Sequence, residues 1–245
     1  MYKTINIMGY EILEGDISTI KIDNNQKNVV NTLNAHSYVI AKKDVQFKEA
    51  LNKSDLLIAD GSGVVLAAKV INQKTIKKIA GYDLHNYLLE ELNKVGGKCF
   101  YMGASQSTLN KIHERISKDF PNVKVSSYSP PFKSSFTKEE NDVILSKVNA
   151  FEPNVLFIGM TAPKQEKWLE ENKEALTFNI ASSIGAVFDF YAGTIERPSA
   201  FWLNLHLEWL ARLLAEPKRL WQRNFISTPL FLFEIFLYKV GLKKK

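Results

Sequence analysis

A carboxylate and two glycines stand where a strand is expected to pass into a helix. The apolar run Leu56–Ala59 predicts a buried strand, and Asp60-Gly61-Ser62-Gly63 leads from it into an apolar, alanine-rich helix. Backbone N–H groups at such a helix start can hold an anion such as a phosphate. A carboxylate that faces a phosphate site must either bind a metal ion or accept a proton. Asp60 is therefore a candidate metal ligand or general base.

Metal-binding patterns are absent from the sequence. It contains no Asp-x-Asp pair, the acid pair with which sugar-nucleotide enzymes usually hold a divalent ion. No histidine has a cysteine or a second histidine at the spacing of metal ligands. We expect the four histidines to be packing or surface residues: His36, His85, His113 and His206. At Asp60 this favours proton acceptance, and we expect neither a metal nor another cofactor.

Motifs of other enzyme classes are also missing. No Gly-x-x-x-x-Gly-Lys-Ser/Thr occurs, which disfavours hydrolysis of a nucleoside triphosphate. No Gly-x-Gly-x-x-Gly follows a strand, which disfavours a dehydrogenase. A nicotinamide-dependent enzyme remains an alternative that a test of NAD binding would decide.

Three further apolar runs end in a glycine or a small-residue turn. They are Cys99–Gly103, Val155–Gly159 and Ile180–Gly185, and helical stretches separate them. Alternating buried strands and helices predict an α/β fold with a parallel sheet and helices on both faces. Ligands of such sheets bind beyond the carboxyl ends of the strands, the edge at which Asp60 and these glycines fall. The pattern favours a nucleotide-sized pocket, and the alternative is that the glycines only form tight turns.

The remaining elements follow from periodicity and from turn residues. Short strands are expected at Thr4–Met8, before a Gly9-Tyr10 turn, and from Val29 onward. Ser129–Ser135 is interpreted as a connecting loop. Helices are expected over 35–41, 45–52, about 83–94, 106–119, 137–150 and 163–174.

The stretch Thr161–Trp168, which follows the strand ending at Gly159, has polar residues at a helix start. Pro163 suits the first helical turn, where its missing N–H has no cost. Such a start would direct Lys164 and Gln165 to the space above the sheet, where they can contact phosphate or sugar. Spacing alone supports equally well a helix N-terminus with solvated polar residues.

Composition sets broad limits. The chain has 245 residues, 45% hydrophobic and 24% charged, which suits one large α/β domain with or without an appendage. The single cysteine, Cys99, lies in an apolar run and is expected to be a buried core thiol, which suits the cytoplasm. The N-terminus lacks the pattern of a signal peptide.

The net charge of +6 is concentrated in the C-terminal segment. Residues 197–245 contain nine Lys and Arg against three Asp and Glu, so residues 1–196 are neutral. A basic segment can bind nucleic acid, anionic lipid or an anionic substrate. Its aromatic residues Trp202 and Trp209 belong to an apolar stripe with Leu205 and Leu213, which is expected to pack on the domain. Because they do not alternate with charges, nucleic-acid binding is disfavoured.

Three arginines of this segment can bind phosphate. Arg212, Arg219 and Arg223 would share a face of one helix, and Pro217 is expected to end that helix and start a second one. From two short helices the arginines can still converge on a phosphate, although a solvated face is the alternative.

The apolar stretch Leu230–Val240 is followed by a lysine cluster. It is too short to span a bilayer, which needs roughly 20 apolar residues. It can lie in the interface of an anionic leaflet, or it can pack on the domain or on a second subunit, which leaves a homo-oligomer open.

Several long motifs follow one another along the chain. They are Ala59–Lys69, Ala80–Leu84, Ala162–Trp168, Gly185–Gly193 with Arg197-Pro198, and Leu207–Leu213 running on to Glu216–Trp221. In residues and order they resemble the TagA/WecG/CpsF family of bacterial glycosyltransferases, over nearly the whole chain after about residue 29. The resemblance implies an inverting, metal-independent transfer of a sugar from a UDP-sugar to a polyprenyl-diphosphate-linked acceptor. It also implies a Rossmann-like core of the GT-E type and a C-terminal appendage that completes the site at the membrane.

The same resemblance assigns roles to residues. Asp60 falls on the catalytic base of the family, and Thr32 and Asn34 fall on an element near that base, with Thr32 as the second catalytic candidate. Gln165 falls on a polar substrate contact. Lys78 stands where many members carry an arginine. The remaining candidate substrate contacts are Gly61, Gly103, Gly159, Lys164, Gly185 and the appendage residues Arg212, Arg219 and Arg223.

The sequence therefore predicts a Rossmann-like catalytic domain over 1–196 and a basic, helical, membrane-proximal appendage over 197–245. The expected function is hexosyl transfer, with N-acetylmannosaminyl as one such group, in the synthesis of a capsule, an O-antigen or a teichoic acid linkage unit. The expected location is the inner face of the bacterial cell membrane, as a peripheral protein. The alternative is a protein that binds a nucleotide sugar or a lipid diphosphate without turnover.

Overall fold

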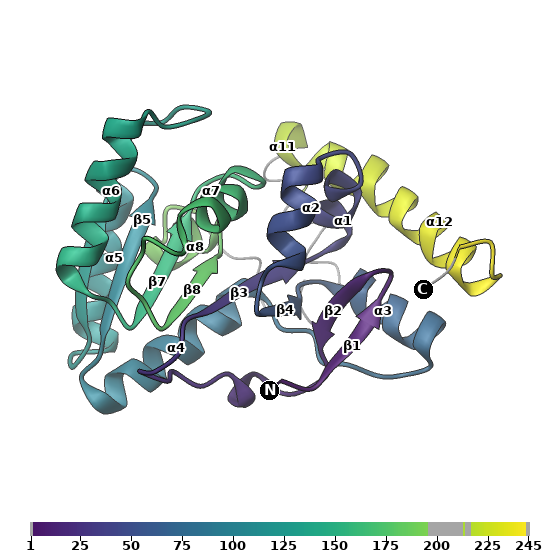
Figure 1. Ribbon diagram of the computed structural model, residues 1–245, viewed down its shortest axis with the longest axis horizontal. Helices are drawn as coiled ribbons and strands as arrows, with labels where there is room; N and C mark the ends of the chain where they lie inside the picture. The colour runs from purple at the N-terminus through teal and green to yellow at the C-terminus, as the bar shows by residue number, and fades with distance from the viewer. Residues whose placement is uncertain (1, 196–212, 214–216, 244–245) are drawn as a thin grey trace.

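An eight-stranded sheet forms the centre of the molecule in the computed structural model, which describes residues 2–195, 213 and 217–243 (Figure 1). The strands lie in the order β1-β2-β4-β3-β8-β7-β5-β6. They are β1 (Thr4–Ile7), β2 (Tyr10–Leu13), β3 (Asn28–Leu33), β4 (Leu56–Ala59), β5 (Lys98–Gly103), β6 (Lys124–Tyr128), β7 (Val155–Gly159) and β8 (Ile180–Ser183).

All neighbouring strands are parallel except β1 and β2, which form an antiparallel hairpin at one edge. The hairpin turn consists of Met8 and Gly9, whose φ angles of 53° and 87° fit a two-residue turn between twisted strands. Tyr10 begins β2, so the turn lies one residue earlier than the sequence predicts. The predicted parallel α/β sheet is confirmed, with this hairpin as an addition.

Helices cover both faces of the sheet, as the sequence predicts (Figure 1). Side chains alternate along β5 and β7: Tyr101 and Phe157 pack beneath one layer of helices, whereas Phe100 and Leu156 pack beneath the other. The first layer comprises α4 (Gly81–Val95), α5 (Gln106–Asp119) and α8 (Val187–Ala192), and the second comprises α6 (Lys138–Phe151) and α7 (Lys164–Asn172).

A further apolar cluster joins the hairpin to α1 (Ala35–Ala41), α2 (Val45–Asn52) and α3 (Ser62–Asn72). Asn34 and Asp44 cap the N-termini of α1 and α2, since their side-chain oxygens accept hydrogen bonds from the first-turn N–H groups. Both helices have the bounds that the sequence predicts, and each starts directly after a strong capping residue.

Strand β6 and helix α7 differ from expectation, and the bounds of α4 and α6 differ from the expected ones by one or two residues. β6 at the sheet edge was not predicted, because none of its residues is buried and it contains no apolar run. Helix α7 begins at Lys164, one residue after the predicted start, and Pro163 lies just before it, after a cis peptide bond with Ala162.

The predicted core residues are confirmed. Cys99 is buried on β5, and burial raises the pKa of its thiol. His85 is also buried, with its Nε2 2.6 Å from the hydroxyl oxygen of Tyr101. Burial lowers the pKa of His85 to about 3, so it is a neutral packing residue. His36 and His113 are half-buried and each contacts a serine hydroxyl, whereas His206 lies outside the described residues.

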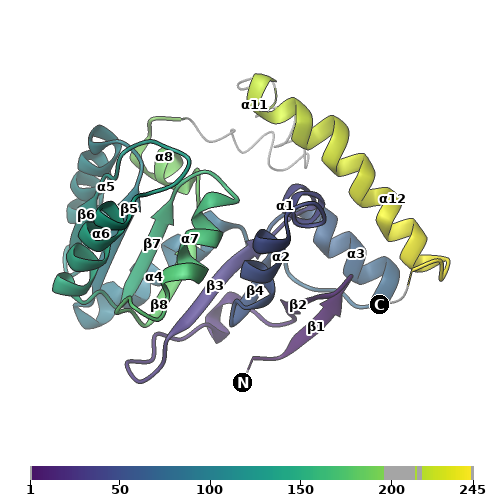
Figure 2. The same cartoon turned by 45° about the horizontal axis from the view of Figure 1, so that its top comes forward.

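In the described part of the C-terminal segment, residues 217–239 are helical and lie along the outside of α1 and α3 (Figure 2). They form α11 (Pro217–Gln222), the π-helical turn η2 (Arg223–Ser227) and α12 (Thr228–Lys239). Helix α11 begins at the proline expected to start a second helix. Phe231 and Ile235 of α12 are buried against the domain, while Phe233 and Phe236 remain exposed. In the part of the chain that the structure describes, no helix is long and apolar enough to cross a membrane.

The apolar stripe predicted for Trp202, Leu205 and Trp209 lies outside the described residues, and Leu213 is buried. The division of the chain at residue 196 falls at the same gap. The two predicted domains therefore stay a prediction.

Candidate functional site

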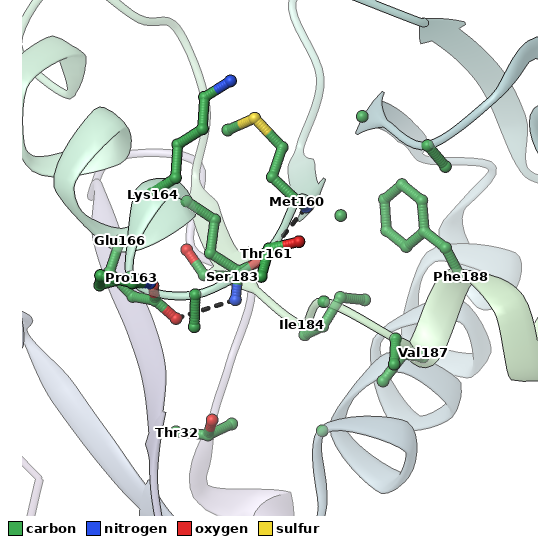
Figure 3. Close-up of a pocket in the computed structure, with 18 of the residues that line it drawn as sticks. Thr32, Met160, Thr161, Pro163, Lys164, Glu166, Ser183, Ile184, Val187 and Phe188 are labelled. Atoms are coloured by element: carbon green, nitrogen blue, oxygen red, sulfur yellow. Dashed lines mark hydrogen bonds between the residues drawn. The ribbon is translucent and has the colours of Figure 1, made fainter. Parts of the chain in front are cut away.

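A cavity of about 1890 Å³ lies at the carboxyl ends of the parallel strands. The ends of β3, β4, β5, β7 and β8 line it, and the loop after β6 and the C-terminal segment form further walls. Figure 3 shows part of this cavity, with Thr32, Ser183 and Glu166 among its lining residues. Such an edge is where ligands of parallel α/β sheets bind.

The structure brings most of the predicted site residues together in this cavity. Arg212 lies outside the described residues, and of Arg219 only the place of its backbone in α11 is described. The cavity is lined by Thr32, Asn34, Asp60, Gly61, Lys78, Gly103, Gly159, Lys164, Gln165, Gly185 and Arg223.

Asp60 is held at the end of β4. Its backbone N–H donates to the carbonyl oxygen of Leu33 at 2.9 Å, which ties it to the end of the neighbouring strand β3. Gly61 follows with a φ of 112°, a conformation that residues with a Cβ rarely adopt. The backbone N–H of Ile79 bonds to Ala59 at 2.9 Å, which places Lys78 next to the same strand end. A half-buried carboxylate and an exposed lysine thus line one part of the cavity.

Thr32 and Asn34 reach the cavity from β3 and from the start of α1. Thr32 pairs in register with Ile58 of β4, two residues before Asp60. The side-chain oxygen of Asn34 accepts hydrogen bonds from the N–H groups of His36 and Ser37, both at 3.0 Å. Asn34 therefore has a structural role as a helix cap, which leaves its amide nitrogen for the predicted contact with substrate.

Gly103 and Gly159 allow two strand ends to approach closely. A Cβ on Gly103 would lie 2.4 Å from the carbonyl oxygen of Gly159, and a Cβ on Gly159 would lie 2.4 Å from the ring of Phe188. The φ of Gly103, 121°, is also in the region that favours glycine. Close packing is therefore a sufficient reason for glycine at both positions. Both glycines also line the cavity.

We expect Gly103→Ala to lower the free energy of unfolding by about 2–4 kcal/mol, because the new methyl group meets backbone and the φ angle becomes strained. Gly193→Ala is the matched control, since Gly193 has a φ of 67° and no atom within 4 Å of its Cβ position. Its expected cost is about 1 kcal/mol. Urea unfolding of both variants measures the difference, and equal losses would contradict the steric explanation.

Gln165 and Glu166 at the start of α7 are buried, with 4% and 5% exposure. The amide nitrogen of Gln165 donates to Oε1 of Glu166 at 2.8 Å, and its amide oxygen accepts from the N–H of Met160 at 3.2 Å. Burial raises the pKa of Glu166 to about 7. The sequence analysis did not name Glu166 as a site residue. It could have been found as the carboxylate within Ala162–Trp168, a motif already assigned to the site.

The loop after β6, interpreted as a plain connection, forms a wall of the cavity. Nζ of Lys164 donates to the carbonyl oxygen of Lys133 at 2.6 Å and lies 3.6 Å from the centre of the Phe136 ring. Burial and the positive charge of Lys133 lower the pKa of Lys164. The loop was missed because its role depends on contact with α7, which is distant in sequence.

The C-terminal segment closes another side of the cavity with Leu220, Arg223 and Asn224. Oγ of Ser227 lies 2.8 Å from Nδ1 of His36, which holds η2 against α1. Burial lowers the pKa of His36, and the charge of Arg223 lowers it further. The carboxylate of Glu234 on α12 pairs with both Lys42 and Lys243. These contacts place Arg223 at the cavity.

The arrangement combines a proton acceptor with several cations around one large cavity. Asp60 can accept a proton, whereas Lys78, Lys164 and Arg223 can hold negative charge. Among the described residues, no group of three or more His, Cys, Asp and Glu is arranged to hold a metal ion. The fold and site thus define a Rossmann-like α/β protein with a nucleotide-sized cavity that suits an anionic substrate.

The chain belongs to the WecG/TagA/CpsF family of glycosyl transferases, whose family model matches residues 6–245. It is therefore a glycosyltransferase, as the resemblance implied.

A relative from Bacillus spizizenii is 28% identical over 223 residues, which cover 91% of this chain and 84% of the relative. It is named N-acetylglucosaminyldiphosphoundecaprenol N-acetyl-beta-D-mannosaminyltransferase. Relatives with the same name occur in Bacillus subtilis, 28% identical over 82% of this chain and 76% of the relative, and in Staphylococcus aureus, 25% identical over 81% and 75%.

Proposed function

We propose that this protein transfers a hexosyl group, N-acetylmannosaminyl in particular, from a UDP-sugar to a sugar linked to a polyprenyl diphosphate. The relatives supply the group and the kind of acceptor, since their name contains both. The observation that carries the proposal is that Asp60, Lys78 and Arg223 line one cavity at the carboxyl edge of the sheet.

In the proposed reaction, the acceptor hydroxyl attacks the anomeric carbon of the donor sugar in a single displacement that inverts its configuration. Asp60 takes the hydroxyl proton as the new carbon–oxygen bond forms. The bond between the sugar and UDP breaks at the same time, and the electron pair leaves with the β-phosphate. Lys78, Lys164, Arg223 and the arginines at 212 and 219 stabilise the negative charge of UDP, so the proposed reaction uses no metal ion.

Thr32, Asn34 and Gln165 are proposed to orient substrate around Asp60. Thr32 and Asn34 belong to the strand end that adjoins Asp60, and Gln165 is fixed by its bonds to Met160 and Glu166. Gly61 allows the backbone to turn beside the base. Gly103, Gly159 and Gly185 are proposed to leave space for the nucleotide in the cavity, because glycine has no side chain.

The protein is further proposed to work as a peripheral protein on the inner face of the bacterial cell membrane, in the synthesis of a surface polysaccharide or its linkage unit. A polyprenyl chain anchors the acceptor in the bilayer, so the cavity must meet the membrane surface. The C-terminal segment supports this placement, because it borders the cavity and exposes apolar residues.

The test is release of UDP by the purified protein in the presence of EDTA. The donors are a panel of UDP-sugars, and the acceptor is a short-chain polyprenyl diphosphate that carries N-acetylglucosamine. We expect release that requires the acceptor, occurs with UDP-N-acetylmannosamine and is unchanged by EDTA. Loss of release in EDTA that is restored by a divalent ion would contradict the metal-independent mechanism. Binding of UDP-sugar without release from any donor would favour the alternative of a non-catalytic binding protein.

A further inference from the structure

Two buried polar atoms in the cavity wall have no hydrogen-bond partner among the described residues. They are Oε2 of Glu166 and Oγ of Ser183, in residues with 5% and 1% exposure. Both residues line the cavity, and both are labelled in Figure 3. The amide of Gln165, which bonds to Glu166, lies 3.6 Å from the Cβ position of Gly185, two residues after Ser183. A buried polar group without a partner costs about 1–3 kcal/mol, so both atoms require a partner that the described residues do not supply.

Both residues are held in place by hydrogen bonds to their neighbours. Oε1 of Glu166 accepts from Gln165, whose amide is fixed in turn by the N–H of Met160. The backbone N–H of Ser183 donates to the side-chain oxygen of Asn31 at 3.2 Å, and Asn31 donates to Ser54 at 3.0 Å. The two unpaired atoms are therefore preorganised, as a binding site requires.

This part of the cavity adjoins the proposed reaction centre. Ser183 ends β8 and bonds to Asn31 of β3, the residue before Thr32. Strand β3 is in turn paired with β4, which leads into Asp60. The part of a donor that lies near Asp60 is the sugar to be transferred, because its anomeric carbon is the reacting atom.

The chemistry of the subsite matches an amide that carries a methyl group. A protonated Glu166 can donate to a carbonyl oxygen, and the Ser183 hydroxyl can accept from an amide N–H. The apolar residues Ile184, which follows Ser183 in the chain, and Val187 also line the cavity (Figure 3). Burial holds the pKa of Glu166 near 7, so the protonated carboxyl is present at neutral pH and below.

The charged groups around α7 form ion pairs among themselves. Lys167 pairs with Asp44 at the start of α2, at 2.6 Å. Lys53 at the end of α2 and Lys173 both pair with Glu170. Lys164 is directed to the loop after β6, where it bonds to Lys133. These pairs do not include Glu166. No cation in this set therefore counteracts the rise in the pKa of Glu166 that burial causes.

We propose that Glu166 and Ser183 form a subsite that binds the acetamido group of the transferred N-acetylhexosamine. This inference rests on the proposed function and names the residues that select the donor. Glu166 donates to the acetyl oxygen, Ser183 accepts from the amide N–H, and the methyl group packs towards Ile184 and Val187. Both residues bind substrate, and neither takes part in the transfer of the proton.

The test measures binding by calorimetry for three ligands: UDP-N-acetylmannosamine, UDP-mannose and UDP. The two sugars differ only in the acetamido group, which a hydroxyl replaces in mannose. We expect the wild-type protein to bind the acetamido donor at least about tenfold more tightly than UDP-mannose at pH 6. Ser183→Ala and Glu166→Leu should each reduce this preference to roughly threefold or less and leave UDP binding unchanged.

The pH dependence separates a binding role from a structural one. The wild-type preference should fall as the pH rises from 6 to 9, because an ionised Glu166 cannot donate to the acetyl oxygen. Glu166→Gln keeps a donor at this position and should preserve the preference at every pH. Ser182→Ala is the matched control: Ser182 is buried beside Ser183, but its hydroxyl donates to Val30 at 2.6 Å, and its loss should not change the preference.

Two results would overturn the proposal. In one, Ser183→Ala and Glu166→Leu weaken the binding of UDP as much as the binding of the UDP-sugar. This result would assign this part of the cavity to the nucleotide. In the other, the wild-type protein binds UDP-mannose and UDP-N-acetylmannosamine equally well. Failure of the wild-type protein to bind any UDP compound would instead contradict the proposed function, so the two failures are distinguishable.

Discussion

Replacing Asp60 with asparagine is expected to lower kcat by about 10²–10⁴-fold, because the amide has the shape of the carboxylate but cannot accept the proton of the acceptor hydroxyl. Affinity for UDP-sugar should change little, since the proposed contacts to UDP come from Lys78, Lys164 and Arg223 on other elements. The fold should be preserved, because asparagine has nearly the same size and shape as aspartate, and the bond of Asp60 to Leu33 is made by its backbone N–H. The measurement is steady-state UDP release with saturating acceptor, together with calorimetric donor binding.

Asp55→Asn is the matched control for this prediction. Asp55 precedes β4, the strand that Asp60 follows, and lies at its opposite end, where its carboxylate accepts the N–H of Val29 at 2.7 Å. An asparagine oxygen can accept the same bond, so activity should remain near that of the wild-type protein. A wild-type rate for Asp60→Asn in a folded protein would exclude Asp60 as the base.

Weaker membrane binding is expected when Phe233 and Phe236 are both changed to serine. Each phenylalanine is 56% exposed, and their rings are 6.5 Å apart, whereas Phe231 and Ile235 of the same helix are buried on the domain. Helix α12 thus has one face packed and one apolar face exposed. Transfer of the two exposed rings into a bilayer interface is worth about 2–3 kcal/mol, so the double variant should bind vesicles roughly 50-fold more weakly.

Vesicles that contain anionic lipid are the probe, with sedimentation as the measurement. The lysines after α12 are Lys243, Lys244 and Lys245. Their attraction to anionic lipid is screened by salt, so the wild-type protein should bind the vesicles more weakly at high salt. Val95→Ser is the control, because Val95 is 78% exposed at the end of α4, just before the amino end of β5, far along the sheet from the cavity edge. Unchanged vesicle binding by the double variant, with loss of a dimer instead, would assign this face to a second copy of the chain.

The sequence alone was sufficient to predict those elements whose type and position depend on their own residues. The starts of α1 and α2 follow from the capping residues Asn34 and Asp44. The strands β4 and β7 are continuous apolar runs, and such runs are buried in a parallel sheet. The gathering of site residues at one edge was predictable as well, because the carboxyl ends of parallel strands meet there.

Other features depend on contacts between distant parts of the chain. Strand β6 is held by pairing with β5, although its own residues have no apolar pattern. The loop after β6 becomes a cavity wall through the bond of Lys164 to Lys133. Glu166 looks like any exposed glutamate in a helix, and only burial in the fold gives it a raised pKa. None of these features could be predicted from spacing within one element.

The sequence by itself determined the α/β class, the family and the group of residues that face the carboxyl edge, because periodicity and long ordered motifs are properties of the linear chain. The tertiary structure decided which of these residues support the fold and which remain available to a ligand. It assigned the Asn34 oxygen to a helix cap and left Oε2 of Glu166 without a partner among the described residues of the cavity wall. Such assignments depend on burial and on hydrogen-bond partners, and these exist only after distant segments have packed together.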